Sequence, residues 1–160
     1  MKAKVFLSAV LAIMLSVSCG DKASVSVSEG TGQITYDGNN YSVKIATLIT
    51  GEAGSEGKYS HHISFVSPET GNYFSFGIEN DSSESVIPVG VYQVAENENS
   101  ASFSIKAGTE TVTGSPTGTM TVGRRGDSHE FSFTGSFNPG QGAKEIKFSY
   151  IGGLKIKSAS

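Results

Sequence analysis

The sequence contains no tryptophan, only four prolines and a single cysteine, Cys19, among its 160 residues. One cysteine excludes a disulfide framework within the chain. The longest apolar run, residues 5–17, is shorter than the roughly 20 residues that a transmembrane helix needs. No segment of useful length has apolar residues at the spacing of an amphipathic helix. These absences argue against a disulfide-bonded scaffold, a permanent membrane span and a helix-rich fold.

The first eighteen residues have the organisation of a secretory signal peptide. Lys2 and Lys4 form a short positive region, the apolar run follows, and the small residue Ser18 directly precedes Cys19. Residues 15–19, Leu-Ser-Val-Ser-Cys, resemble the lipidation box of bacterial lipoprotein signals, with the leucine one position early and a valine in place of a small residue. The resemblance implies cleavage before Cys19 and acyl chains, palmitate among them, on its sulfur. An ordinary cleaved signal is the alternative.

Composition divides the chain into a signal peptide (residues 1–18), a lipidated cysteine with a flexible stalk (residues 19–32) and one folded domain (residues 33–160). The tripeptide Gly-Asp-Lys after Cys19 resembles the tag that directs lipoproteins of Bacteroides-type bacteria to the outer surface. We therefore expect a lipid anchor in the outer membrane, on its periplasmic or its surface face. Removal of the signal takes two lysines from the 12 basic residues and leaves 15 acidic ones, a net charge of about −5. An acidic domain argues against nucleic acid as a partner.

Short segments of alternating apolar and polar residues recur through the domain, separated by turn residues. Phe74, Phe76 and Ile78, for example, fall on one face of their segment. Residues 41–49 place a larger set on one face: Tyr41, Val43, Ile45, Thr47 and Ile49. This rhythm predicts an all-β fold, a single antiparallel β-sandwich of about nine or ten strands, with a closed β-barrel around an internal ligand as the alternative.

The second half of the domain carries a set of strand and turn segments: Ile87-Pro88-Val89-Gly90-Val91-Tyr92, Gly118-Thr119-Met120-Thr121-Val122, Gly126-Asp127 and Lys147-Phe148-Ser149-Tyr150-Ile151-Gly152-Gly153-Leu154. Together they resemble a family of small Bacteroides-type envelope lipoproteins that have an all-β, sandwich-like domain and no known function. The shared segments are strand and turn chemistry. The resemblance therefore implies an architecture and an envelope location, and it supplies no catalytic residue.

Two groups of residues are candidate binding sites. Arg125, Gly126 and Asp127, followed by Ser128, make the tetrapeptide that integrins read in matrix proteins, and they lie at an expected hairpin tip. Ordinary turn chemistry is the alternative explanation for the glycine and the aspartate. Tyr59 and Tyr73 are candidate stacking platforms for a sugar, with packing in the sheet as the alternative.

The sequence predicts neither a metal site nor a catalytic centre. His61 and His62 are neighbours in an expected strand, so their side chains point to opposite faces and cannot chelate one ion. No cysteine set or His-x-His pattern accompanies them. No serine lies in a Gly-x-Ser-x-Gly segment, and the sequence does not show a pair of carboxylates across a cleft. We therefore expect no cofactor.

These observations favour a non-enzymatic, membrane-anchored binding or adhesion module whose ligand is a glycan or a protein. Its polar loops at residues 50–58 and 81–85 are the expected contact regions. The first alternative is an accessory subunit of an envelope or uptake complex, which an exposed apolar patch would indicate. The second is a hydrolase, which a pocket with converging carboxylates or histidines would indicate.

Overall fold

The computed structural model of the chain describes residues 24–52, 57–81, 87–95, 98–140 and 142–154. Cys19 lies outside these ranges, and all regular structure within them is β-strand. In this part of the chain, no helix has the length and apolar character needed to cross a membrane. The strands are β1 (Ser24–Tyr36), β2 (Asn39–Glu52), β3 (Tyr59–Val66), β4 (Tyr73–Asn80), β5 (Gly90–Val94), β6 (Ser100–Ala107), β7 (Glu110–Gly114), β8 (Thr117–Arg125), β9 (Ser128–Phe137) and β10 (Lys144–Gly152).

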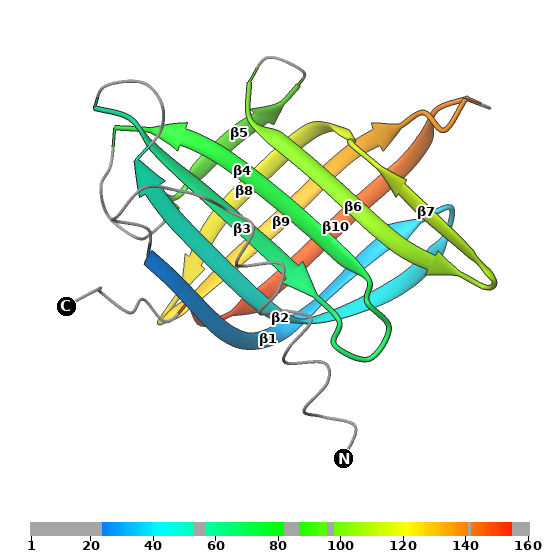
Figure 1. Cartoon of the computed structure of the whole chain (residues 1–160), viewed down its shortest axis with the longest axis horizontal. Helices are drawn as coiled ribbons and strands as arrows, with labels where there is room; N and C mark the ends of the chain where they lie inside the picture. The colour runs from blue at the N-terminus through cyan, green and yellow to red at the C-terminus, as the bar shows by residue number, and fades with distance from the viewer. Residues whose placement is uncertain (1–23, 53–56, 82–86, 96–97, 141, 155–160) are drawn as a thin grey trace.

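The strands form one antiparallel sheet in the order β5-β8-β9-β10-β1-β2-β3-β4-β6-β7. Most neighbours in the sheet are also neighbours in the chain, as short hairpin connections require. Figure 1 shows the sheet curling over at β1, so that β3, β4 and β6 lie across β8, β9 and β10. The result is a half-barrel whose two halves face each other as the layers of a sandwich do. The prediction of an all-β, antiparallel fold is confirmed.

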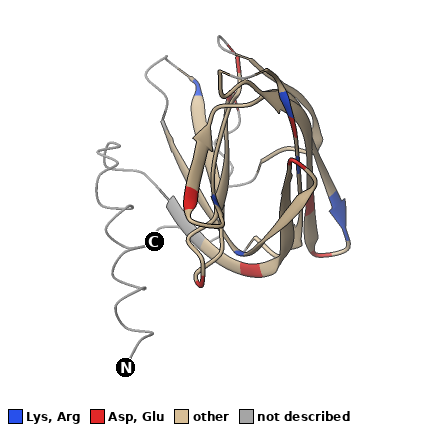
Figure 2. Cartoon of the chain, turned by 90° about the vertical axis from the view of Figure 1, so that its right-hand side faces the viewer, with Lys and Arg blue, Asp and Glu red and all other residues tan. Residues whose placement is uncertain are grey.

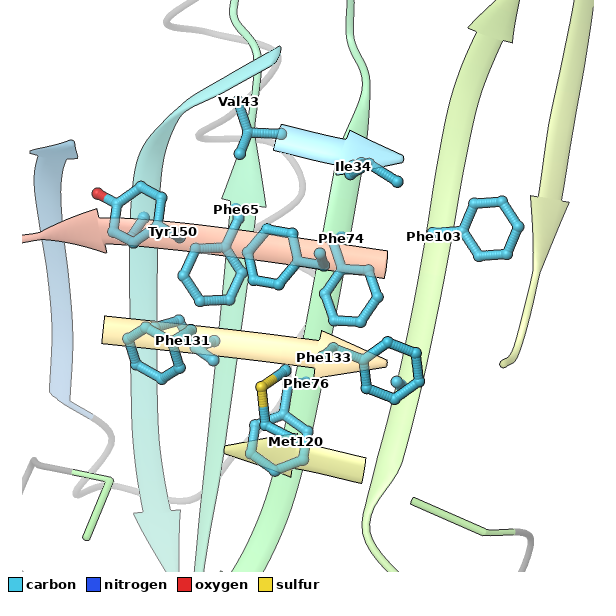
Figure 3. Packing of buried hydrophobic residues seen from close by; sticks show 14 of the residues in the cluster. Ile34, Val43, Phe65, Phe74, Phe76, Phe103, Met120, Phe131, Phe133 and Tyr150 are labelled. Carbon is cyan, nitrogen blue, oxygen red and sulfur yellow. The ribbon is translucent and has the colours of Figure 1, made fainter. Parts of the chain in front are cut away.

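Aromatic rings from both halves fill the space between the layers (Figure 3). The centroid of the Phe65 ring on β3 lies 4.6 Å from that of Phe148 on β10 and 5.0 Å from that of Phe131 on β9. On β4, the ring of Phe74 stacks on Phe148 with a centroid distance of 4.4 Å. All four side chains are almost completely buried. Such packing fixes the two layers against each other.

The sheet passes from one layer to the other at a bulge in β1. The register between β1 and β2 shifts between Glu29 and Gly32, and the pairing of β1 with β10 begins at Gly30. The ring of Tyr150 fills the bend, and a Cβ atom at Gly30 would overlap its hydroxyl group. A side chain therefore does not fit at this position, which explains the glycine. Burial raises the pKa of Tyr150 to about 12.

The bulge also decides which residues of β2 face the interior. Ala46 and Leu48 lie beside buried residues of β3 and are buried themselves. The prediction that Ile45 and Ile49 share the interior face with Val43 is therefore wrong. Beyond the bulge, alternation along the strand places both isoleucines on the outer face.

The sheet begins earlier in the chain than the sequence analysis places it. Residues 24–32, expected to be stalk, form the first part of β1 and pair with β2 from Ser24 onward. These residues therefore belong to the folded domain. The rest of the expected stalk, residues 19–23, lies outside the described residues.

Candidate functional site

An open hollow of about 420 Å³ lies over β3, β4 and the start of β6. Its position corresponds to the end of the sheet where β3 and β6 begin and β4 ends. Most of the residues that line it have polar side chains. The lining consists of Ser60, His62, Gly77, Ile78, Glu79, Glu98, Asn99 and Ser100. The volume is within the range of about 300–1,000 Å³ that is usual for small-molecule sites.

A glycine forms the floor of the hollow. Gly77 pairs with His62 on one side and with Ser100 on the other. A Cβ atom at Gly77 would lie 2.8 Å from Ser100 Oγ and 3.3 Å from His62 Nδ1, whereas the nearest main-chain atom would be 4.0 Å away. The space between the imidazole and the hydroxyl group is therefore open because position 77 has no side chain.

The flanking residues explain why this glycine stays in a regular strand. Phe76 and Ile78 are buried in the interior, and alternation along β4 then places Gly77 and Glu79 on the outer face. The φ angle of Gly77 is not positive, so its extended backbone is one that other residues also adopt. Its absence of a side chain, rather than its conformational freedom, is the property that shapes the hollow.

The charge of the hollow is negative. Glu79 and Glu98 are exposed, and neither forms an ion pair within the described ranges. The nearby cation Lys58 is already paired with Asp81. Figure 2 shows acidic and basic residues interspersed over the described strands, without a gathered basic surface. The two carboxylates are thus available to accept hydrogen bonds from a ligand or to pair with its positive charge.

The imidazole of His62 adds a group that donates and accepts. Partial burial in the hollow lowers the pKa of His62 below its ordinary value, so the ring is neutral at pH 7. A neutral imidazole has one donor nitrogen and one acceptor nitrogen. Among the described residues, no group of three histidine, cysteine, aspartate or glutamate side chains is placed to hold a metal ion. The arrangement is suited to hydrogen bonding with a polar ligand.

The two candidate tyrosines are not brought together, and neither lines the hollow. Tyr59 begins β3 beside Asn80, while Tyr73 begins β4 beside Val66, so they lie at opposite ends of this hairpin. They also lie on opposite faces of the sheet, because Tyr59 alternates with buried residues and Tyr73 precedes a buried one. The two tyrosines therefore do not form one stacking platform, and a role for either of them alone in binding a sugar stays a prediction.

The Arg125-Gly126-Asp127 segment lies at the tip of the β8–β9 hairpin, in the other half of the sheet. All three residues are exposed, and Gly126 has a φ of 59°, which suits a tight turn. Arg125 forms an ion pair with Glu130, with 2.7 Å between Nε and Oε1. The tip is accessible, but its arginine already pairs with a carboxylate of the same hairpin.

Comparisons of the chain with protein-family models, with curated proteins and with solved structures found no match. The resemblance to small envelope lipoproteins stays a prediction. The geometry of the hollow and the signal-like pattern at the start of the sequence are the observations from which a function can be proposed.

Sequence reasoning considered His62 only as a candidate metal ligand and did not connect it with Ser60, Gly77 or Ser100. The hollow joins three strands, and β6 reaches β4 only after the chain has passed through β5 in the other half of the sheet. One signal was present: a glycine inside an alternating apolar strand often marks a place where a ligand comes close.

A second histidine, His129, is buried in β9, outside the hollow. Its Nε2 accepts a hydrogen bond from Arg124 Nε at 3.4 Å, and its Nδ1 has no hydrogen-bond partner in the part of the chain that the structure describes. Burial, together with the charge of Arg124, lowers the pKa of His129 from its ordinary value of 6.5. The folded protein therefore holds this imidazole neutral at a pH where the unfolded chain protonates it.

The different protonation of His129 in the folded and the unfolded chain predicts a loss of stability in acid. As the pH falls below about 6.5, the unfolded chain binds a proton that folded His129 does not, so the free energy of unfolding decreases until the folded pKa is reached. The loss of stability is measured by chemical denaturation of the wild type and of His129→Gln. The measurements run from pH 7.5 to pH 5, values chosen to bracket the ordinary pKa. The wild type is expected to lose more stability than the variant over this interval. Parallel pH profiles would contradict the prediction.

Proposed function

We propose that the chain is a lipid-anchored, non-enzymatic binding module of a bacterial outer membrane, and that the hollow over β3, β4 and β6 is its ligand site. The anchor is supported by the signal pattern that ends at Cys19. The resemblance to small envelope lipoproteins favours the same location. The observation that carries the binding site is the Gly77 floor, which leaves an open polar volume between His62 and Ser100.

The groups around the hollow favour a ligand rich in hydrogen-bond donors. The carboxylates of Glu79 and Glu98 accept hydrogen bonds only, whereas His62 and the serine hydroxyls both donate and accept. Sugar hydroxyl groups and amino groups fit this set. A glycan terminus or a cationic side chain of a protein is therefore the ligand class that we propose.

Filling the floor of the hollow is the direct test. Gly77→Val is expected to abolish binding, because its side chain occupies the space between the imidazole and the serine hydroxyl. The fold is expected to survive, because β-branched residues suit strands and a glycine in a strand interior is itself destabilising by roughly 0.5–1 kcal/mol relative to alanine. Binding of residues 20–160 is measured on a glycan array and in pull-downs with envelope and host proteins.

The matched control is Gly123→Val. Gly123 lies in β8, has no positive φ, and a Cβ atom there would make only ordinary contacts of 3.8 Å or more. This variant is expected to bind as the wild type does. If Gly77→Val binds the ligand as the wild type does, the ligand site lies elsewhere on the protein. If the wild type binds nothing in either assay, the result counts against a binding module.

A further inference from the structure

The polar groups of the hollow lie in two adjacent rows across the outer face of the sheet. His62, Gly77 and Ser100 are paired in one row. Ser60 and Glu79 are paired in the next row, nearer the end of the sheet. Neighbouring positions on one face of a sheet are roughly 5–7 Å apart, both along a strand and across strands. One small group above Gly77 is therefore within reach of side chains from both rows.

A second carboxylate comes from the segment that leads into β6. Glu98 lies two residues before Ser100, where β6 begins, and it lines the same hollow as Glu79. The lining contains no lysine or arginine. Like charges that share one site repel each other, and a concave surface strengthens their field. A positive charge between the two carboxylates relieves this repulsion.

The balance of donors and acceptors separates a cationic ligand from a neutral one. Five side chains of the lining form no hydrogen bond or ion pair with other residues in the described ranges: Ser60, His62, Glu79, Glu98 and Ser100. Two of the five are carboxylates, which only accept, so acceptors outnumber donors. A sugar hydroxyl brings an acceptor with each donor, whereas an ammonium group brings three donors and no acceptor. The ammonium group therefore matches this excess better.

The neighbouring basic groups do not neutralise the hollow. Lys58 does not line it, and the Lys58 ammonium group is paired with Asp81. Burial lowers the pKa of His62, so its imidazole adds no positive charge at pH 7. The uncharged ring offers one nitrogen as a further acceptor. The hollow therefore keeps its negative charge at neutral pH.

We infer that the hollow recognises a primary ammonium group, with Glu79 and Glu98 as its counter-charges and with the space above Gly77 as its seat. The inference rests on the proposed ligand site and narrows its ligand class. An amino sugar and a lysine side chain are the two sources of this chemistry. Acetylation of either one removes the charge and two of the three N–H donors, and it adds a carbonyl acceptor that faces the carboxylates. The acetylated forms are therefore excluded from the hollow.

Two pairs of probes test the ammonium group directly. One pair is an oligosaccharide of glucosamine and the N-acetylglucosamine oligosaccharide of the same length. The other pair is a peptide with one lysine and the same peptide with acetyl-lysine. Binding to the full-length protein in a nonionic detergent is measured by isothermal titration calorimetry at neutral pH. At least one amine is expected to bind about tenfold more tightly than its acetylated partner, because hydrogen bonds between charged groups are the stronger ones. Added salt is expected to weaken that binding.

Substitution of the carboxylates tests which groups supply the counter-charge. Glu79→Gln and Glu98→Gln keep the size of the side chain and remove its charge, and each is expected to weaken binding of the amine about fivefold or more. The matched control is Glu110→Gln, which removes the same charge at an exposed position on β7, outside the hollow. This variant is expected to bind as the wild type does. Circular dichroism checks the fold of all three variants.

The outcomes distinguish the ammonium group from the ligand site itself. The inference is overturned if each amine binds no better than its acetylated partner, if neither amine binds, or if both glutamine variants bind the amine as the wild type does. A neutral glycan that binds the wild type and not Gly77→Val overturns the ammonium group and keeps the ligand site. Amine binding that is unchanged in Gly77→Val overturns both proposals.

Discussion

Replacing Phe65 with alanine is expected to lower the free energy of unfolding by about 3–5 kcal/mol. The ring is fully buried and contacts Phe131, Phe148 and Tyr150 of the facing half of the sheet. Removing it leaves a cavity that neighbouring rings cannot refill without leaving their own contacts. Urea denaturation followed by circular dichroism measures the loss. A domain with the usual total of about 5–15 kcal/mol would become marginal.

The adjacent residue provides the control. Val66 lies on the outer face and is only partly buried, so Val66→Ala is expected to cost about 1 kcal/mol or less. The two variants are expected to differ in their loss of unfolding free energy because alternation along β3 points Phe65 into the interior and Val66 to the outer face. Equal losses in the two variants would mean that the layers do not pack around Phe65.

The second large effect is expected from Cys19→Ser. Each buried methylene of an acyl chain contributes about 0.8 kcal/mol, and stable anchoring needs more than one chain. Without the sulfur no acyl chain can be attached, so labelled palmitate should fall to background and the protein should move to the aqueous phase in detergent phase separation.

Ser18→Ala is the control for this change, because it keeps a small residue before an intact Cys19. It is expected to incorporate palmitate as the wild type does. The chain has no other cysteine. Palmitate that persisted after Cys19→Ser would therefore contradict acylation at this sulfur and with it the proposed anchor.

Local patterns predicted the strands because each strand needs only its own residues to reveal alternation. The β8–β9 hairpin shows this best: a turn was expected at residues 125–127, and β8 ends at Arg125 while β9 begins at Ser128. Gly126 has the positive φ that the turn requires. Phe74 and Phe76 are buried as their spacing predicts.

The bulge and the hollow depend on pairing between strands, which periodicity does not encode. Alternation assigned Ile45 and Ile49 to the interior because it assumed a regular β2, and the register shift opposite Glu29 reverses them. The hollow needs β4 to pair with β6, and no feature of the intervening residues specifies that neighbour. Residues 24–32 have few large side chains, and their place in β1 comes from pairing with β2 and β10.

The two outermost strands, β5 and β7, have a consequence for many copies held at high local concentration. Each is five residues long, Pro88 precedes β5 and Pro116 follows β7. A short edge bounded by proline offers a neighbouring chain few free N–H and C=O groups for strand addition. Dense arrays of this protein are thus protected against fusing into intermolecular fibres.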